Sequence, residues 1–107
     1  MSSDKVSHEC GLFGIWGHSE AARLAYYGLH SLQHRGQDGA GIVVKSGNVL
    51  TRNKGLGLLT EVFTSDTLAH MHGTSAVGHV LYSSGGKPDH AAIQPLLFHF
   101  EKSSLAV

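Results

Sequence analysis

A run of apolar residues at helical spacing most constrains the fold of this chain. Four of them follow one another at intervals of three, four and three residues: Ala22, Ala25, Leu29 and Leu32. This spacing places them on one face of an α-helix, which must be buried against another layer of structure. Ser19 is expected to cap the N-terminus of the helix and Gly36 to end it. Gly28 costs about 1 kcal/mol relative to alanine inside a helix, so we expect a close packing contact there.

Strand-like runs lie on both sides of this helix. Strands are predicted over residues 10–16, 40–45, 49–54, 75–82, 96–100 and 105–107. The turn chemistry of Ser46-Gly47-Asn48 predicts a hairpin between the second and third of them. Between the strands we expect a leucine-packed loop at 55–59, short helical pieces at 61–63 and 66–72, and a flexible loop at 83–90. Helices mixed with antiparallel hairpins predict an α+β fold.

The composition excludes several classes of function. The chain has 107 residues and a formal net charge of zero at pH 7, so nothing favours binding to nucleic acid or to an anionic membrane. No apolar run approaches the roughly 20 residues of a membrane span. The nine histidines are scattered without the spacing of a metal site, so neither a metal nor another cofactor is expected. A polar leader too short for a secretory signal, together with a single cysteine, predicts a cytoplasmic protein.

The lone cysteine, Cys10, is the candidate for chemistry. It has no cysteine partner for an internal disulfide, which leaves a buried small hydrophobe, a surface thiol or a nucleophile. Gly11 follows it and allows close backbone approach to a reacting group. If the leader 1–9 is removed, the thiol and a free α-amine belong to one residue. An α-amine has a pKa of about 7.7–8.0 and can serve as the general base for its own side chain.

Two stretches carry a resemblance to a known family. Residues 9–17 read Glu-Cys-Gly-Leu-Phe-Gly-Ile-Trp-Gly, and residues 33–38 read Gln-His-Arg-Gly-Gln-Asp. Together with Gly78-His79-Val80 and Gln94-Pro95-Leu96, they resemble the amidophosphoribosyltransferase family of class II glutamine amidotransferases, which are N-terminal-nucleophile (Ntn) hydrolases. The resemblance implies glutamine as substrate, ammonia release for purine synthesis, and homo-oligomeric full-length relatives.

The resemblance also implies a domain plan. Residues 1–9 are expected to be a leader or propeptide, and residues 10–107 the first half of a four-layer αββα sandwich. The phosphoribosyltransferase domain, which in the family binds phosphoribosylpyrophosphate and Mg²⁺, is not among the 107 residues. The family's His-Asn-Gly oxyanion segment is expected beyond Val107. Losing an oxyanion donor costs about 100–1,000-fold in turnover, so the chain alone is expected to show little or no glutaminase activity.

Site residues are carried over from the family one by one. Cys10 takes the place of the nucleophile and Arg35 that of an arginine at the glutamine site. Ser84 stands where the family has a threonine and keeps the hydroxyl. Leu81 replaces the arginine that holds the substrate carboxylate, a contact worth about 1.5–3 kcal/mol. His79 is interpreted as a hydrogen-bonded structural histidine rather than a base.

Two alternatives remain open. The first is an inactive, truncated fragment or interaction module that pairs with another chain through an unfinished sheet edge. The second is a different class II amidotransferase, such as the glucosamine-6-phosphate-forming type. The Gln-His-Arg-Gly-Gln-Asp stretch counts against this second alternative.

Overall fold

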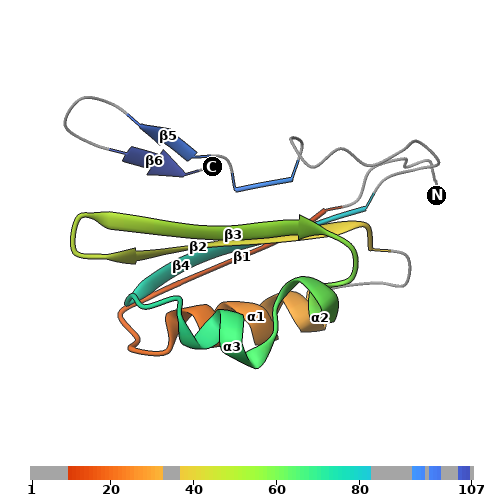
Figure 1. The fold of residues 1–107 in the computed structure, drawn as a ribbon, viewed down its shortest axis with the longest axis horizontal. Helices are drawn as coiled ribbons and strands as arrows, with labels where there is room; N and C mark the ends of the chain where they lie inside the picture. Colours follow the sequence, from red (N-terminus) through yellow and green to blue (C-terminus); the bar gives the residue numbers. More distant parts are fainter. Residues whose placement is uncertain (1–9, 33–36, 83–92, 96, 100–103, 107) are drawn as a thin grey trace.

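The computed structural model describes residues 10–32, 37–82, 93–95, 97–99 and 104–106. Its centre is one antiparallel sheet with the strand order β1-β4-β2-β3. The four strands are β1 (Cys10–Trp16), β2 (Gly39–Ser46), β3 (Val49–Leu56) and β4 (Ser75–Leu81). Three helices lie on one side of the sheet: α1 (Ala21–Leu32), α2 (Leu59–Val62) and α3 (Ser65–Ala69) (Figure 1). A two-stranded hairpin of β5 (Leu97–His99) and β6 (Ser104–Ala106) lies on the other side (Figure 1).

Strand β4 joins the two halves of the sheet, because it pairs with both β1 and β2. At one end of the sheet the register aligns Cys10, Leu81 and Gly39 in a row. At the other end it aligns Trp16 with Ser75. Because side chains alternate along a strand, each row of aligned residues faces one side of the sheet. None of the described helices has the length and apolar character of a membrane span.

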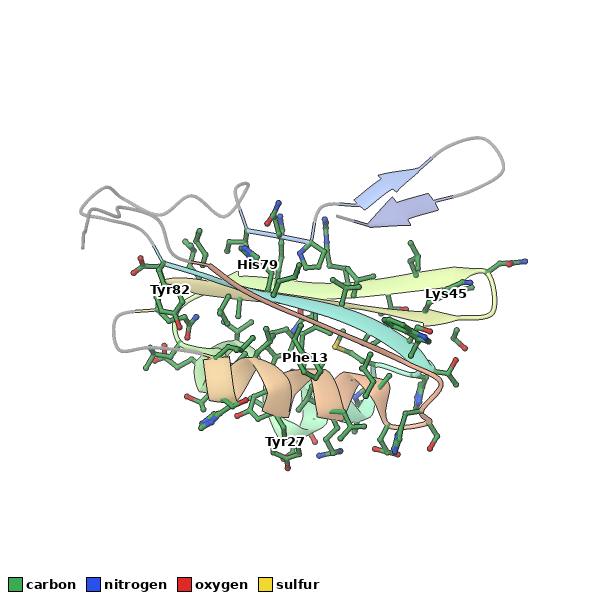
Figure 2. All side chains as sticks on the ribbon, turned by 180° about the vertical axis from the view of Figure 1, so that it is seen from behind. Phe13, Tyr27, Lys45, His79 and Tyr82 are labelled. Carbon is green, nitrogen blue, oxygen red and sulfur yellow. The ribbon has the colours of Figure 1, made fainter. Side chains whose placement is uncertain are left out.

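Helix α1 packs through three of the four residues of the predicted apolar face, since Ala22, Ala25 and Leu29 are buried together with Ala21. The prediction is wrong for Leu32, at the end of the helix, which is 39% exposed. Small alanines let the helix approach the sheet closely, and the predicted contact at Gly28 is confirmed: a Cβ there would overlap the ring of Phe13. Figure 2 shows Phe13 on the helix side of the sheet and His79 on the opposite side.

The start of α1 differs from the prediction. Ser19 does not lie next to the first helical residue, Ala21, so Glu20 occupies the cap position. The Glu20 backbone N–H donates to Nδ1 of His18 at 2.9 Å, and Leu24 N–H donates to the Glu20 carbonyl at 3.0 Å. The imidazole of His18 thus accepts from the backbone N–H of the residue at the cap position itself. The predicted stop at Gly36 lies outside the described residues.

The β2–β3 hairpin forms as predicted and is longer than expected. Gly47 has φ +59° at the first position of its two-residue turn, which suits a type II′ turn. The predicted loop at 55–59 is wrong, because β3 continues through Leu56 and α2 begins at Leu59. Gly57, at φ +115°, makes the turn between them. Of the three leucines in that run only Leu59 is buried. The expected loop at 83–90 lies outside the described residues.

A short segment crosses the face of the sheet opposite the helices. It comprises Ile93, Gln94 and Pro95, with a cis bond between the last two, and is called the 93–95 segment below. Ile93 is fully buried and its side chain lies over Gly39. The carbonyl of Gln94 lies so close to Gly41 that a Cβ there would collide with it. Glycines on β2 therefore let this backbone approach the sheet.

Candidate functional site

Cys10, the predicted nucleophile, is the first residue of β1. The register places its backbone directly across from Leu81, the residue that stands where the family has an arginine. The Leu81 carbonyl in turn accepts a hydrogen bond of 2.7 Å from the backbone N–H of Asp38. The position that would hold a substrate carboxylate thus lies next to the predicted nucleophile, and here it carries an apolar side chain.

Arg35, Ser84 and the leader 1–9 lie outside the described residues. The last described residues before these two predicted substrate-binding residues are Leu32 and Tyr82. Leu32 precedes Arg35 and Tyr82 precedes Ser84, and the Tyr82 hydroxyl donates to the Leu32 carbonyl at 3.5 Å. The last described residues before Arg35 and Ser84 are therefore in contact at the end of the sheet that holds Cys10.

A buried amide, Gln37, connects three elements at this end of the fold. Its Nε2 donates to the carbonyls of Gly39 at 2.8 Å and Gly57 at 2.7 Å. Its Oε1 accepts from the backbone N–H of Leu59 at 2.7 Å. The side chain thus ties the start of β2 to the turn after β3 and to the first residue of α2. Sequence reasoning gave Gln37 no role, although it lies in the Gln-His-Arg-Gly-Gln-Asp stretch that carries the resemblance.

His79 is the second buried polar side chain, with 5% of its surface exposed. Its Nδ1 has no hydrogen-bond partner among the described residues. The prediction of a hydrogen-bonded histidine is therefore wrong for this nitrogen within the described part of the chain. Burial lowers the pKa of His79 below its ordinary value, because the charged imidazolium is poorly solvated there. The side chain is on the strand that we predicted and is neutral at pH 7.

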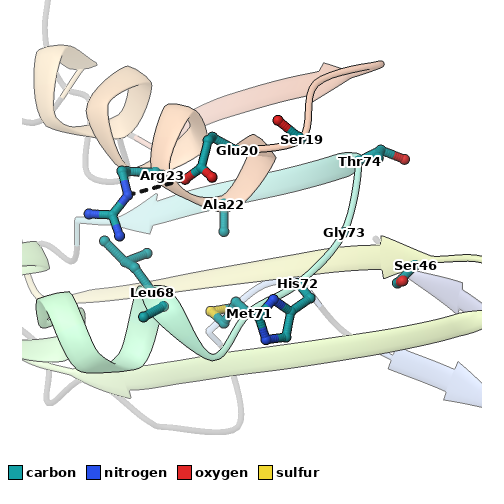
Figure 3. A pocket seen from close by; sticks show the side chains of 11 residues that line it. Ser19, Glu20, Ala22, Arg23, Ser46, Leu68, Met71, His72, Gly73 and Thr74 are labelled. Carbon is teal, nitrogen blue, oxygen red and sulfur yellow. Dashed lines mark hydrogen bonds and ion pairs between the residues drawn. The ribbon is translucent and has the colours of Figure 1, made fainter.

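A cavity of about 370 Å³ lies at the other end of the sheet (Figure 3). It lies among the start of α1, the end of α3 and the residues just before β4. Arg23 and Glu20 at its rim form an ion pair of 3.4 Å. No described polar group in it is both buried and unpartnered. The described residues also contain no cluster of three His, Cys, Asp or Glu side chains able to hold a metal. The cavity is therefore separate from the site at Cys10.

Comparison with known proteins identifies the relatives of this chain. No family model matches the sequence. Amidophosphoribosyltransferase of Bacillus subtilis is 53% identical over 103 residues, which are 95% of this chain and 22% of that enzyme. The Staphylococcus aureus (strain MRSA252) enzyme is 52% identical over 103 residues, with 95% and 21% covered. The chain matches the N-terminal glutamine amidotransferase region of amidophosphoribosyltransferase.

Solved structures agree with this match to amidophosphoribosyltransferase. One, described as the allosteric regulatory enzyme of purine biosynthesis, has a TM-score of 0.83 at 54% identity and covers 89% of this chain and 21% of its own. The B. subtilis enzyme complexed with ADP and GMP has a TM-score of 0.78 at 54% identity, with 89% and 20% covered. The predicted α+β fold of the Ntn-hydrolase type is confirmed by these similarities. The chain spans about a fifth of the length of the amidophosphoribosyltransferases it matches.

Proposed function

We propose that this chain carries the glutamine-hydrolysing half-reaction of an amidophosphoribosyltransferase, with Cys10 as the nucleophile. The observation that supports this most directly is the position of Cys10 at the start of β1, at the end of the sheet where the flanks of Arg35 and Ser84 converge. The sequence identity to amidophosphoribosyltransferases covers this whole region. Arg35 and Ser84 are proposed to bind glutamine, and the reaction to take place in the cytoplasm.

The proton transfers and bond changes of this half-reaction use the thiol and α-amine of the nucleophile residue and water. After removal of residues 1–9, the α-amine of Cys10 takes the thiol proton, and the thiolate attacks the side-chain amide carbon of glutamine. The carbon–nitrogen bond breaks, the amine returns the proton to the leaving group, and ammonia departs. Water then hydrolyses the γ-glutamyl thioester to glutamate and regenerates the thiol. A further domain would bind phosphoribosylpyrophosphate and Mg²⁺ and receive the ammonia.

A second candidate function rests on Leu81. An apolar residue directly across from Cys10 removes the charged anchor for the α-carboxylate of glutamine that the family resemblance implies. A charge-assisted hydrogen bond of about 1.5–3 kcal/mol corresponds to one to two orders of magnitude in affinity. The alternative is therefore a module that keeps the fold of the glutamine site and has lost its substrate.

Intact mass measurement with a glutamine-analogue electrophile, 6-diazo-5-oxo-norleucine, tests both candidates. A chain that lacks residues 1–9 and carries one adduct on Cys10 supports the glutaminase proposal. An uncleaved, unlabelled chain that is folded by circular dichroism contradicts it and supports the module. The Cys10→Ala variant is the control, since it must remain unlabelled in either case.

Substitution of Leu81 tests the carboxylate anchor separately. Leu81→Arg is expected to raise the labelling rate by about 10–100-fold over the wild type, as the added contact requires. Leu81→Met is the matched control, because it changes the shape of the side chain and adds no charge. Equal labelling rates in both variants would show that position 81 does not contact the substrate carboxylate.

A further inference from the structure

The 93–95 segment crosses the row of the sheet that lies two residues along the strands from the row of Cys10, on the same face. In this row the register aligns Leu12, His79, Gly41 and Lys54 across the four strands. The Gln94 carbonyl lies over Gly41, and Nζ of Lys54 donates to the Ile93 carbonyl at 3.2 Å. His79 is the direct neighbour of Gly41 on β4. The imidazole therefore lies on the sheet face that this segment crosses, beside its contact with β2 (Figure 2).

The surroundings of His79 oppose a positive charge in two ways. The side chain is buried, and no described group accepts a proton from its Nδ1. The elements around it carry no acidic residue: β1 to β4 and the 93–95 segment contain neither Asp nor Glu. The charged residues of the four strands are three cations, Lys45, Arg52 and Lys54. Within the described part of the chain, an imidazolium at this position would thus be poorly hydrated and would have no acidic residue beside it on these elements.

We infer that His79 is a pH-sensitive latch for the 93–95 segment: the neutral imidazole allows the segment to pack on β2, and the protonated form favours its release. A neutral imidazole is compatible with the segment closed over β2. Protonation requires hydration of the ring, and release of the segment from Gly41, the direct neighbour of His79 on β2, would admit water beside the ring. Closure of the segment therefore disfavours protonation of His79. By linkage, protonation of His79 disfavours closure by the same factor.

The sign of the effect follows from the direction of the shift. Burial lowers the pKa of His79 in the closed state below the ordinary value of about 6.5. Above that value both states are neutral and the segment is closed. As pH falls below about 6.5, the open state takes up the proton first, and the open population grows until pH reaches the closed-state pKa. Each unit of pKa difference corresponds to about a tenfold change in the opening equilibrium.

NMR of the full chain tests the latch without reference to enzymatic activity. The Cε1 proton of His79 is followed from pH about 8 to about 5, the range in which histidine titrates. In Gly41→Ala the new Cβ collides with the Gln94 carbonyl, which displaces the segment without changing any charge. The His79 midpoint is then expected to rise toward 6.5. Gly14→Ala is the matched control, because its nearest obstacle is 3.9 Å away, and its midpoint should equal that of the wild type.

A second variant and a second NMR signal keep the inference testable if the Gly41→Ala variant does not fold. Ile93→Ala removes the buried anchor of the segment over Gly39 and should also raise the His79 midpoint. The δ1-methyl signal of Ile93 reports the closed segment directly. In the wild type it should shift as pH falls below 6.5, and in His79→Gln, which cannot become charged, it should not shift. A wild-type midpoint at or above 6.5, or the same midpoint in every folded variant, would overturn the inference.

Discussion

The ring of Phe13 occupies the space that a side chain at Gly28 would need, since a Cβ built on Gly28 would lie 2.5 Å from Cδ1 of the ring. This contact sets the distance between α1 and the edge strand β1. Alanine at position 28 would gain about 1 kcal/mol of helix propensity but would force the ring to move.

Gly28→Ala is therefore expected to lower the free energy of unfolding by about 1–3 kcal/mol, measured by urea denaturation. Gly14→Ala, whose new Cβ would make only an ordinary van der Waals contact, 3.9 Å from the Ala76 carbonyl oxygen, is the control. Adding Phe13→Leu to Gly28→Ala should recover part of the loss, because a smaller side chain makes room for the methyl group. A Gly28→Ala variant more stable than the wild type would show that the ring moves aside at little cost.

Loss of the Gln37 amide should lower the stability of the fold by a large amount for a single side chain. Gln37→Met keeps the length of the side chain and removes its three hydrogen bonds to Gly39, Gly57 and Leu59. Each buried group left without a partner costs about 1–3 kcal/mol, so we expect a loss of about 3 kcal/mol or more in urea denaturation. Asn48→Ala in the exposed hairpin turn should change stability by less than about 0.5 kcal/mol. A loss below about 1 kcal/mol in Gln37→Met would mean that water replaces the amide.

Substitution of two leucines on the helical side of the fold should lower the free energy of unfolding by very different amounts. Leu29 is fully buried between α1 and β4, where it contacts Gly78, whereas Leu58 is 47% exposed. Leu29→Ala is expected to cost about 2–5 kcal/mol of unfolding free energy and Leu58→Ala about 0.5 kcal/mol or less. Thermal denaturation followed by circular dichroism compares them. Similar losses in the two variants would contradict the assignment of the core to the α1 side of the sheet.

The stability of the fold should depend on pH through His79. Because burial lowers its folded-state pKa, the unfolded chain binds a proton at higher pH than the folded chain. The stability that the folded chain gains from neutral His79 is complete above about pH 6.5. It is lost as pH falls from there toward the folded-state pKa of His79. His79→Gln should flatten the profile of unfolding free energy in this window, as measured by urea titrations at several pH values. Parallel profiles for the two proteins would contradict the prediction.

Local patterns were sufficient to predict most of the regular structure. The strand predicted over 10–16 has the bounds Cys10–Trp16, and the hairpin turn is centred on Gly47 as its chemistry indicated. Alternation, turn residues and helical spacing are properties of neighbouring residues, so a sequence shows them directly. The predicted start of α1 was wrong by one residue, because the helix begins at Ala21 and the cap position is therefore Glu20 rather than Ser19.

The features that sequence reasoning missed depend on contacts between distant residues. Gln37 bonds to groups 20 and 22 positions further along the chain, which no local pattern reveals. His79 is buried on the sheet face that the 93–95 segment crosses, so its environment becomes visible only when the sheet is assembled. The placement of Leu81 across from Cys10 likewise required the register of β1 and β4. The roles of Cys10, Arg35 and Ser84 remain predictions.

The strand order has a consequence for how the chain is made. Among the described strands β1 pairs only with β4, so Cys10 leaves the ribosome long before its partner Leu81 is translated. Helix α1 and the β2–β3 hairpin are built from nearby residues and can form in the meantime, whereas pairing between distant segments is slow. The strand that begins with Cys10 therefore cannot be fixed in the sheet before β4. Any maturation at Glu9–Cys10 that needs the folded site must wait until β4 has been synthesised.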